Sequence, residues 1–338
     1  MFRWLFVLVL VIAITPFAYL AGFGFYHGLN VINGIKTFTL SLINRDLVYS
    51  ENNRVDASEL ETADVEIIWR GKLENERLEE ASGLAFGAES DVLFSVNDSG
   101  NAPELFAVGL DGKDVGVWPI DYARNHDFED MASFVLQGEP YLLVADTGDN
   151  LNWRSHLTLL ALEEPTMDSV GEMLEPVWTV EFRFPKGYRD VEGVAVDEKD
   201  ELVYLISKRR IPAEVFTVPL KAEGVVTAQK VASLRGVPAP TARDLREDPN
   251  WGRASSSPTA FDLHGRTAMV VTYKEAYLFQ RARRDAWAKT FSGLPKRVPL
   301  PEIWGLESGA LGSSDVFYVT GEREDGIAAT DVFEVRLP

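Results

Sequence analysis

The stretch DVEGVAVDEKDELVYLISKRRIPAEVFTVPL (190–220) decides the fold. It holds three short apolar runs, EGVAVD (192–197), LVYLISK (202–208) and EVFTVPL (214–220), which are separated by charged and turn-forming residues. Short runs rich in Val, Ile, Leu and Phe with turns between them are typical of β-strands that are buried on both faces. We therefore expect three consecutive strands that form an antiparallel meander.

The same three-strand unit recurs five times along the chain. The first strands are SGLAF (82–86), EDMASFV (129–135), EGVAVD (192–197), TAFDL (259–263) and ESGAL (307–311). The second strands are VLFSVND (92–98), YLLVADT (141–147), LVYLISK (202–208), AMVVTYK (268–274) and VFYVTGE (316–322). The third strands are ELFAVGL (104–110), LTLLALE (157–163), EVFTVPL (214–220), EAYLFQR (275–281) and DVFEVRL (331–337). Fourth strands are expected at DVGVWPI (114–120), VWTVEFRF (177–184) and AQKVASL (228–234), with WAKTF (287–291) a weaker candidate.

These repeats predict an all-β protein in which residues 64–338 form a β-propeller of four-stranded blades. A unit that cannot bury its own faces must stack on its neighbours, and meanders stacked radially make a propeller. We count five blades; six is the alternative, with residues 235–257 the least accounted for. The last unit has only three strands, and VEIIWRGKL (65–73) is available as its fourth. That pairing would close the ring and bury two sheet edges.

The N-terminal segment, residues 1–27, is predicted to be a transmembrane anchor. Trp4 to Tyr26 contains no ionisable group except the Tyr26 phenol, and its 23 residues span ~34 Å as a helix, enough to cross a ~30 Å hydrocarbon core. A cleaved signal peptide is the alternative, but the apolar run outlasts a usual signal and no A-x-A site follows it. Residues 28–63 read as a connector. Arg3 before the span favours a single-pass protein of the inner (cytoplasmic) membrane with its C-terminal domain periplasmic.

The net charge of the chain limits the classes of molecule that it can bind. Without Arg3, the only charged side chain of the anchor, 32 basic residues face 52 acidic ones, a net charge of −20. Such a domain repels the phosphates of nucleic acids and anionic lipids, so we expect no nucleic-acid partner. The same charge favours cations.

Alignment of the repeats brings two columns of polar residues to one end of the channel. In an antiparallel meander, the start of one strand and the end of the next lie at the same end of the sheet. The first column is Ser82, Glu129, Glu192, Thr259 and Glu307, and the second is Asn97, Asp146, Ser207, Thr272 and Thr320. Residues beside these columns extend the expected mouth, namely Asp98, His126, Asp130, Asp149, Asn150, Lys208 and Lys274. A small molecule or a protein would bind at this mouth.

Three glutamates on one ring need a positive partner, because like charges at close range repel. One interpretation is a structural plug in which Lys208, Arg209 or Lys274 neutralises the carboxylates. The other is a Ca²⁺ site with Glu129, Glu192, Glu307, Asn97 and Asp146 as ligands, since Ca²⁺ takes oxygen ligands in flexible geometry. Zinc is not favoured, because the chain has no Cys and its four His show no ligand spacing. His126, just before Glu129, is a remote candidate for a general base.

The motifs NDSG (97–100), HDFEDMA (126–132), DTGDN (146–150), DVEGVAV (190–196), ISKR (206–209) and TYK (272–274) occur in this order. Over roughly residues 80–325 the chain thereby resembles a family of bacterial secreted or membrane-attached β-propellers with no agreed activity. Phe128 stands where that family usually has Trp. The resemblance implies a propeller outside the cytoplasm. More distantly, the architecture is similar to calcium-dependent propeller hydrolases such as lactonases, phytase-like enzymes and apyrases, but no catalytic set matches residue by residue.

Two functions follow from these observations. The first is a Ca²⁺-dependent hydrolase of a small phosphorylated or ester substrate. The second is a non-catalytic envelope module that binds a protein at the channel mouth. Dependence of activity on a metal separates the two.

The Trp4–Tyr26 span predicts that the C-terminus lies outside the cytoplasm. Alkaline phosphatase fused after Pro338 should be active in intact bacterial cells, whereas a fluorescent protein that matures only in the cytoplasm should stay dark. The control is the same pair of fusions to a chain that begins at Glu51, where we expect the reverse pattern. Activity of only the cytoplasmic reporter on the full chain would refute the topology.

Overall fold

The computed structural model describes residues 55–247, 256–323 and 330–338, together with residues 32, 35, 39, 48 and 49. The chain divides into two compact units, residues 1–46 with 149–155 and residues 47–148 with 156–338. The second unit contains all the strands described below, and it is considered by itself. The predicted anchor at Trp4–Tyr26 lies outside the described residues. Among those that are described, no helix has the length and apolar character needed to span a bilayer.

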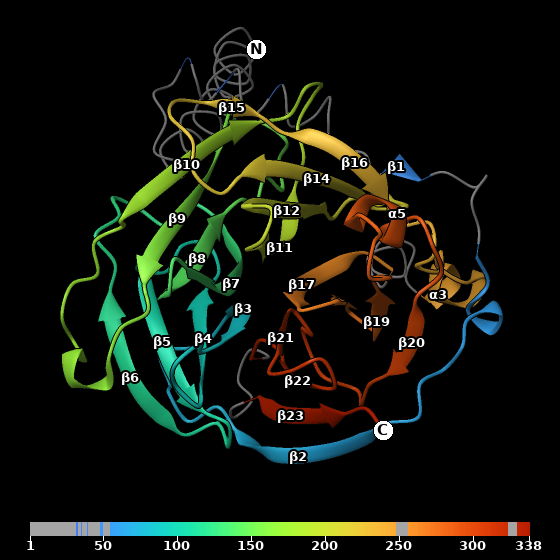
Figure 1. Cartoon of the computed structure of the whole chain (residues 1–338), viewed down its shortest axis with the longest axis horizontal. Coiled ribbons are helices and arrows are strands. Elements are labelled where there is room, and N and C mark those ends of the chain that lie inside the picture. Colours follow the sequence, from blue (N-terminus) through green and yellow to red (C-terminus); the bar gives the residue numbers. More distant parts are fainter. Residues whose placement is uncertain are drawn as a thin grey trace, which may run out of the picture. The chain divides into compact units, whose positions relative to one another are not determined.

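Five sheets arranged around one axis confirm the five-bladed propeller (Figure 1). Blade 1 consists of β3 (Ala81–Phe86), β4 (Val92–Asn97), β5 (Glu104–Gly109) and β6 (Asp114–Pro119). Blade 2 consists of β7 (Phe128–Leu136), β8 (Glu139–Asp146), β9 (Leu157–Glu163) and β10 (Trp178–Arg183), and the short β15 (Val226–Thr227) pairs in parallel with β10. Blade 3 consists of β11 (Val191–Asp197), β12 (Leu202–Ser207), β14 (Glu214–Pro219) and β16 (Gln229–Ser233).

Blade 4 consists of β17 (Pro258–His264), β18 (Thr267–Thr272), β19 (Glu275–Gln280) and β20 (Lys296–Pro299). Blade 5 takes β21 (Ser308–Leu311), β22 (Val316–Thr320) and β23 (Asp331–Arg336) from the end of the chain and β2 (Glu66–Lys72) from near its start. Strand β2 pairs antiparallel with β23, from Glu66 opposite Arg336 to Lys72 opposite Asp331. Figure 1 shows β2 outside β23, so the predicted closure of the ring is confirmed.

The expected fourth strand of blade 4 was misplaced. Residues Trp287–Phe291 form the helix α5, and β20 is the outer strand instead. Trp287 and Phe291 are four residues apart, so a helix puts both on one face, where they are buried with their ring centroids 5.4 Å apart. The pattern of two large apolar residues in WAKTF fits a helix as well as a strand, and burial of both rings decides in favour of the helix.

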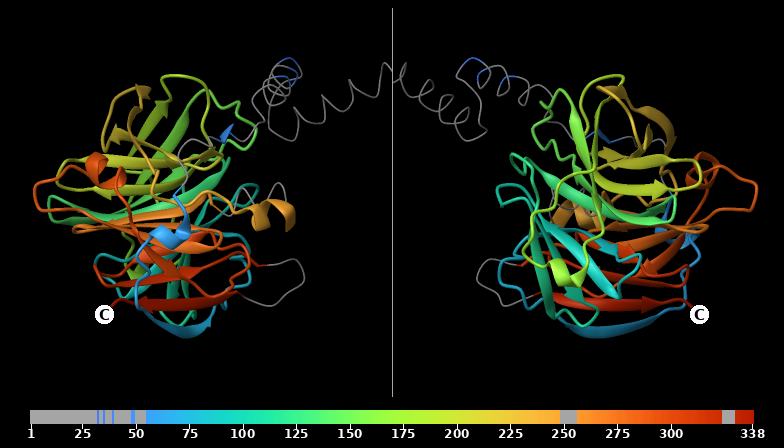
Figure 2. Two further views of the ribbon diagram at one scale, coloured as in Figure 1. Left: turned by 90° about the vertical axis from the view of Figure 1, so that its right-hand side faces the viewer. Right: turned by 60° about the vertical axis from the view of Figure 1, so that its left-hand side comes forward.

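Several short elements complete the unit. The described part of residues 235–257 contains the helix α3 (Ala242–Glu247) and no strand of a sixth blade. The strand β1 (Val48–Tyr49) pairs in parallel with β13 (Arg210–Ile211). Two 3₁₀ turns, η2 (Ala57–Glu59) and η3 (Met167–Ser169), lie in connections. Figure 2 shows α3 and α5 on opposite faces of the propeller.

The core lies between blades, and hydroxyl groups fasten the inner strands to one another. Apolar side chains of adjacent blades pack together, as Phe134 of β7 does in one cluster with Val194 and Val196 of β11. The Ser82 hydroxyl donates to the Glu129 carbonyl of the next blade at 2.8 Å. Equivalent bonds run from Thr147 to Val191 (2.9 Å), Thr259 to Leu306 (2.9 Å) and Ser308 to Ala81 (2.8 Å). These contacts fix the inner ring of strands around which the functional residues lie.

Closure by β2 predicts that its loss opens the ring. A chain that begins at Asn75 would expose the edge of β23 and the apolar faces that β2 covers, so it should lose its cooperative thermal transition. Circular dichroism on heating, compared with a chain that begins at Glu51, measures the effect. Equal melting temperatures for the two chains would show that β2 does not hold the ring.

Candidate functional site: an acidic channel mouth

β-Bulges direct two glutamates into the mouth of the channel. In blade 2, Phe128 pairs with Asp146 and Asp130 with Ala145, so Glu129 between them has no partner across the ladder. In blade 3, Val191 pairs with Ser207 and Gly193 with Ile206, which leaves Glu192 in the same position. A bulge re-aims the side chain of its extra residue. Glu307 lies just before β21 and reaches the same place from blade 5.

The structure brings the three predicted glutamates together. One carboxylate oxygen from each of Glu129, Glu192 and Glu307 lies within 4.8 Å of the others, and all three residues are buried. A second group, with the same spread of oxygens, joins Glu129 to Asp98 and Asp127. Since Ca²⁺–oxygen distances are about 2.3–2.6 Å, oxygens this close can share one ion. Glu129 belongs to both groups and is therefore the centre of the site.

Gly148 lies directly against two of these carboxylates. A Cβ atom at this position would approach Glu129 Oε1 to 2.1 Å and Asp127 Oδ2 to 2.3 Å. Any larger residue would therefore push both carboxylates aside. This contact explains the glycine of the DTGDN motif.

One ammonium group enters the ring of carboxylates. Lys208 Nζ lies 2.6 Å from Glu192 Oε2, and the lysine side chain is only 13% exposed. It also lies 5.3 Å from the centre of the Tyr273 ring, whose hydroxyl donates a short hydrogen bond to Glu307 Oε1. Arg209 pairs instead with the buried Asp190 at 2.7 Å. Lys208 thus supplies the internal neutralisation that the sequence left as one of two alternatives, and a second cation remains compatible with the surplus of acid.

Burial and crowding of like charges shift the pKa values of the mouth. Burial raises the pKa of Glu129 well above its usual value, and Glu192, Asp98 and Asp127 raise it further. Burial also raises the pKa of Glu192, in spite of the opposing Lys208 charge. Burial alone would lower the pKa of Lys208, but Glu192 and Glu307 outweigh it and raise the value well above normal, so the amine stays charged.

The shifts extend to the rim of the mouth. Burial raises the pKa of Asp98 to about 6, with Glu307 and Glu80 adding to it and the backbone bond from Ser99 opposing it. Burial, with Glu307 and Asp98, raises the pKa of Glu322 to about 8. Clusters of shifted carboxylates in one cleft are typical of functional sites.

The side chains of Asn97 and Asp146 are engaged elsewhere. Asn97 donates to the Arg77 carbonyl at 2.7 Å and accepts from the Glu80 amide at 3.1 Å. Asp146 accepts from the Tyr122 hydroxyl at 2.9 Å and from the Asp127 amide at 3.1 Å. Neither of the acidic groups in the described part of the chain includes Asp146. Both residues support the loops of the mouth, and ligation of a metal by them stays a prediction.

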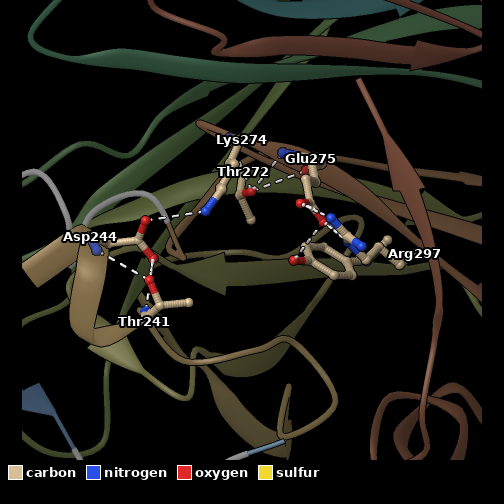
Figure 3. A network of polar contacts seen from close by, with 7 residues as sticks. Thr241, Asp244, Thr272, Lys274, Glu275 and Arg297 are labelled. Atoms are coloured by element: carbon tan, nitrogen blue, oxygen red, sulfur yellow. Dashed lines mark hydrogen bonds and ion pairs between the residues drawn. The ribbon is translucent and has the colours of Figure 1, made fainter. Parts of the chain in front are cut away.

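The predicted hydroxyl residues bond to backbone. Ser82 and Thr259 make the links between blades described above, and Ser207 accepts from the Glu214 amide at 3.0 Å. Thr272 accepts from the amides of Lys274 and Glu275, which shapes the turn after β18 (Figure 3). Lys274 Nζ lies 3.2 Å from Asp244 Oδ1 of α3, so Lys274 forms an ion pair outside the ring of glutamates (Figure 3).

Asp130 lies deeper in the channel than the glutamates. Its Oδ2 accepts from the Val194 amide of β11 at 2.8 Å and from the Phe261 amide of β17 at 3.2 Å. The residue is fully buried, and burial raises its pKa well above the usual value. Asp130 therefore ties blades 2, 3 and 4 together.

The remaining predicted residues differ in what the structure says of them. His126 is exposed. Asp149 accepts from the Trp153 amide at 2.7 Å, and together with Asn150 it belongs to the other compact unit. Their place at the mouth stays a prediction.

The site also contains residues that were not predicted: Asp127, Tyr273 and Glu322. All three lie within one to three positions of a predicted residue, in the quoted motifs HDFEDMA and TYK and in the polar loop GERED (321–325). Asp127 was missed because it precedes the aligned column. Its backbone carbonyl accepts from the amides of Thr147 and Gly148, which joins it to the DTGDN loop. Tyr273 and Glu322 lie in the turns that follow the second strands of their blades. This position was the signal from which their place at the mouth could have been predicted.

Comparisons with known proteins give likeness of architecture only. No protein-family model and no curated protein matches the chain. Glutaminyl cyclase of Myxococcus xanthus is 12% identical over 82% of this chain and 98% of its own, with a TM-score of 0.47. A gluconolactonase of Xanthomonas campestris is 10% identical over 85% of this chain and 94% of its own, with a TM-score of 0.45. The WD40 repeats of RRP9 are 13% identical over 76% and 67%, with a TM-score of 0.39.

The raised pKa of Glu322 predicts a gain in stability when the carboxyl is removed. The folded protein keeps the proton up to about pH 8, whereas the unfolded chain loses it near pH 4.5. The folded state therefore binds more protons in this window, and its free energy of unfolding falls as the pH rises. The free energy of unfolding of Glu322→Gln should exceed that of the wild type by about 1 kcal/mol or more at pH 8. At pH 4 the two values should be equal.

Urea unfolding in the presence of chelator, at both pH values, measures this difference. Glu172→Gln, at an exposed loop position, is the matched control and should change little at either pH. A constant difference between Glu322→Gln and the wild type across the two pH values would contradict the assigned shift.

Proposed function

We propose that the acidic mouth binds Ca²⁺ and that the protein is a cation-dependent hydrolase of a small phosphorylated or ester substrate. The ligands would be Glu129, Glu192 and Glu307, with Asp98 and Asp127 beside them. Their oxygens lie within 4.8 Å in each group, and Ca²⁺ accepts such all-oxygen sets in flexible geometry.

The observation that carries the proposal is the unused oxygen of Glu192. Its Oε2 bonds to Lys208, while its Oε1 is buried and has no hydrogen-bond partner among the described residues. A buried acceptor without a partner costs about 1–3 kcal/mol or more when charged. An ion held between Glu192, Glu129 and Glu307 would satisfy this oxygen, and Lys208 would keep the carboxylate oriented toward it.

The cation would supply the positive charge that an anionic substrate needs in this acidic protein. A bound divalent ion polarises a phosphoryl or ester oxygen and screens the charge of an anionic substrate. Without it, a domain of net charge near −20 repels such a substrate. The anchor at residues 1–27 and a periplasmic position of the propeller are part of the same proposal, and the apolar run Trp4–Tyr26 supports them.

The Lys208–Glu192 ion pair favours a second candidate. If this pair and the Tyr273–Glu307 bond complete the ring, the mouth is a polar plug and the protein is a non-catalytic envelope module that binds a protein ligand. The two candidates differ in what happens when the charge of Glu192 is removed.

Calorimetric titration of Ca²⁺ into chelator-treated protein tests the choice. For the metal site we expect saturable binding, and at a hundredfold excess over Kd the ion should stabilise the fold by about 2.7 kcal/mol. Glu192→Gln should abolish the response, because it removes a ligand charge while it keeps the side-chain shape. Gly148→Ala should weaken the response at least tenfold, because its Cβ displaces the Glu129 and Asp127 carboxylates.

Glu172→Gln is again the control and should bind Ca²⁺ like the wild type. A flat titration of the wild type would end the metal proposal. The plug further predicts that Glu192→Gln lowers the free energy of unfolding by about 3–5 kcal/mol with or without Ca²⁺, because Lys208 would be left buried without its partner.

A further inference from the structure

The opposite end of the channel holds a cavity of about 650 Å³. It is lined by residues at the C-terminal ends of the inner strands, among them Phe86 of β3, Val135 of β7, Val196 of β11, Leu263 of β17 and Leu311 of β21. The glutamates lie at the N-terminal ends of these strands, so the cavity faces away from the acidic mouth. Its volume is within the usual range of small-molecule sites, about 300–1,000 Å³.

The walls offer an apolar surface that a ring could contact. Phe86 and Leu263 are half-buried and Val135 is 41% exposed, so each presents part of its side chain to the cavity. Trp287 of α5 lies behind them, with the Arg281 guanidinium 4.3 Å from the centre of its ring. The position of α5 on the face opposite α3, visible in Figure 2, agrees with two separate ends of the channel.

The carboxylates of this cavity are already engaged. Asp197 Oδ2 accepts from Arg281 Nη1 at 2.9 Å and from Trp287 Nε1 at 2.8 Å. Asp262 accepts from the Leu263 amide at 2.7 Å and from the Leu311 amide at 2.8 Å, and burial raises its pKa to about 7. Glu198 accepts from the Val135 amide at 2.6 Å. Each of these three carboxylates thus already accepts from donors of the protein, and Arg281 neutralises the charge of Asp197.

Two basic side chains of the cavity, unlike Arg281, are not engaged in this way. Lys199 and His264 line it and are exposed. Within the described part of the chain, neither side chain forms an ion pair or a hydrogen bond. The groups that remain for a ligand are thus an ammonium and an imidazole, in a protein that is otherwise strongly acidic.

We infer that this cavity binds a small organic anion, with its apolar or aromatic body against Phe86 and Leu263 and its charged group beside Lys199 and His264. Without a bound cation, the acidic mouth would repel the same molecule. The site is independent of the proposed Ca²⁺ site, and its ligand class differs because the available groups are an ammonium and an imidazole instead of carboxylates.

Isothermal titration of 2-naphthalenesulfonate into the full chain in detergent, with a detergent blank, tests the inference. We expect saturable binding of one molecule per chain, and binding at least tenfold weaker for the uncharged analogue naphthalene-2-sulfonamide. The double variant Lys199→Glu, His264→Glu should weaken sulfonate binding at least tenfold. Ala88→Trp, at an exposed position on the cavity wall, should abolish it by filling the space.

Lys186→Glu is the matched charge control, because Lys186 is exposed in the loop before β11, at the other end of the channel. It should bind the probe like the wild type, as should chelator-treated protein. Near-UV circular dichroism identifies any variant that has not folded, and Lys199→Glu alone then replaces the double variant. Absence of saturable binding, or equal affinity in the cavity variants and the wild type, would overturn the inference.

Discussion

The pairing of β2 with β23 is the contact on which the remaining structure depends. It joins residues 66–72 to residues 331–336, so both ends of the propeller sequence meet in one blade. Without it the outer edge of β23 would be unpaired, and the inner strands β3 and β21 would lose a constraint that keeps them side by side. The Ser308–Ala81 hydrogen bond lies across the same junction. Because the acidic residues come from blades 1, 2, 3 and 5, their assembly requires a closed ring.

Placing several carboxylates in a buried ring opposes folding, and the chain offsets this in different ways. Glu192 has an ammonium partner and Glu307 accepts from a phenol, whereas burial raises the pKa values of Glu129 and Glu322. Deeper in the channel, Asp130 and Asp262 use backbone amides. The arrangement concentrates negative charge at one place while most individual groups remain solvated by the protein, which is the electrostatic preorganisation that a cation site needs.

The repeat made most of the architecture predictable. Blade number, strand order and closure by residues 65–73 follow from pattern and from the instability of open edges, and connectivity alone placed Glu129, Glu192 and Glu307 on one ring. Three kinds of feature could not be predicted from the repeat. Residues 287–291 form a helix because two rings can be buried together, and a five-residue pattern does not distinguish that from a strand. The bulges at Glu129 and Glu192 are set by pairing register, which the sequence does not display. Whether Lys208 or Lys274 enters the ring depended on the competing partner Asp244, whose position only the fold determines.

The bonds from Asp130 to the amides of β11 and β17 have a consequence for how the blades are coupled. One carboxylate of β7 accepts from both strands, so blades 2, 3 and 4 share a single polar contact. Blade 1 packs against the same residue, since a Cβ at Gly83 of β3 would come within 2.6 Å of the Asp130 backbone. A displacement of Asp130 would therefore be transmitted to four of the five inner strands at once.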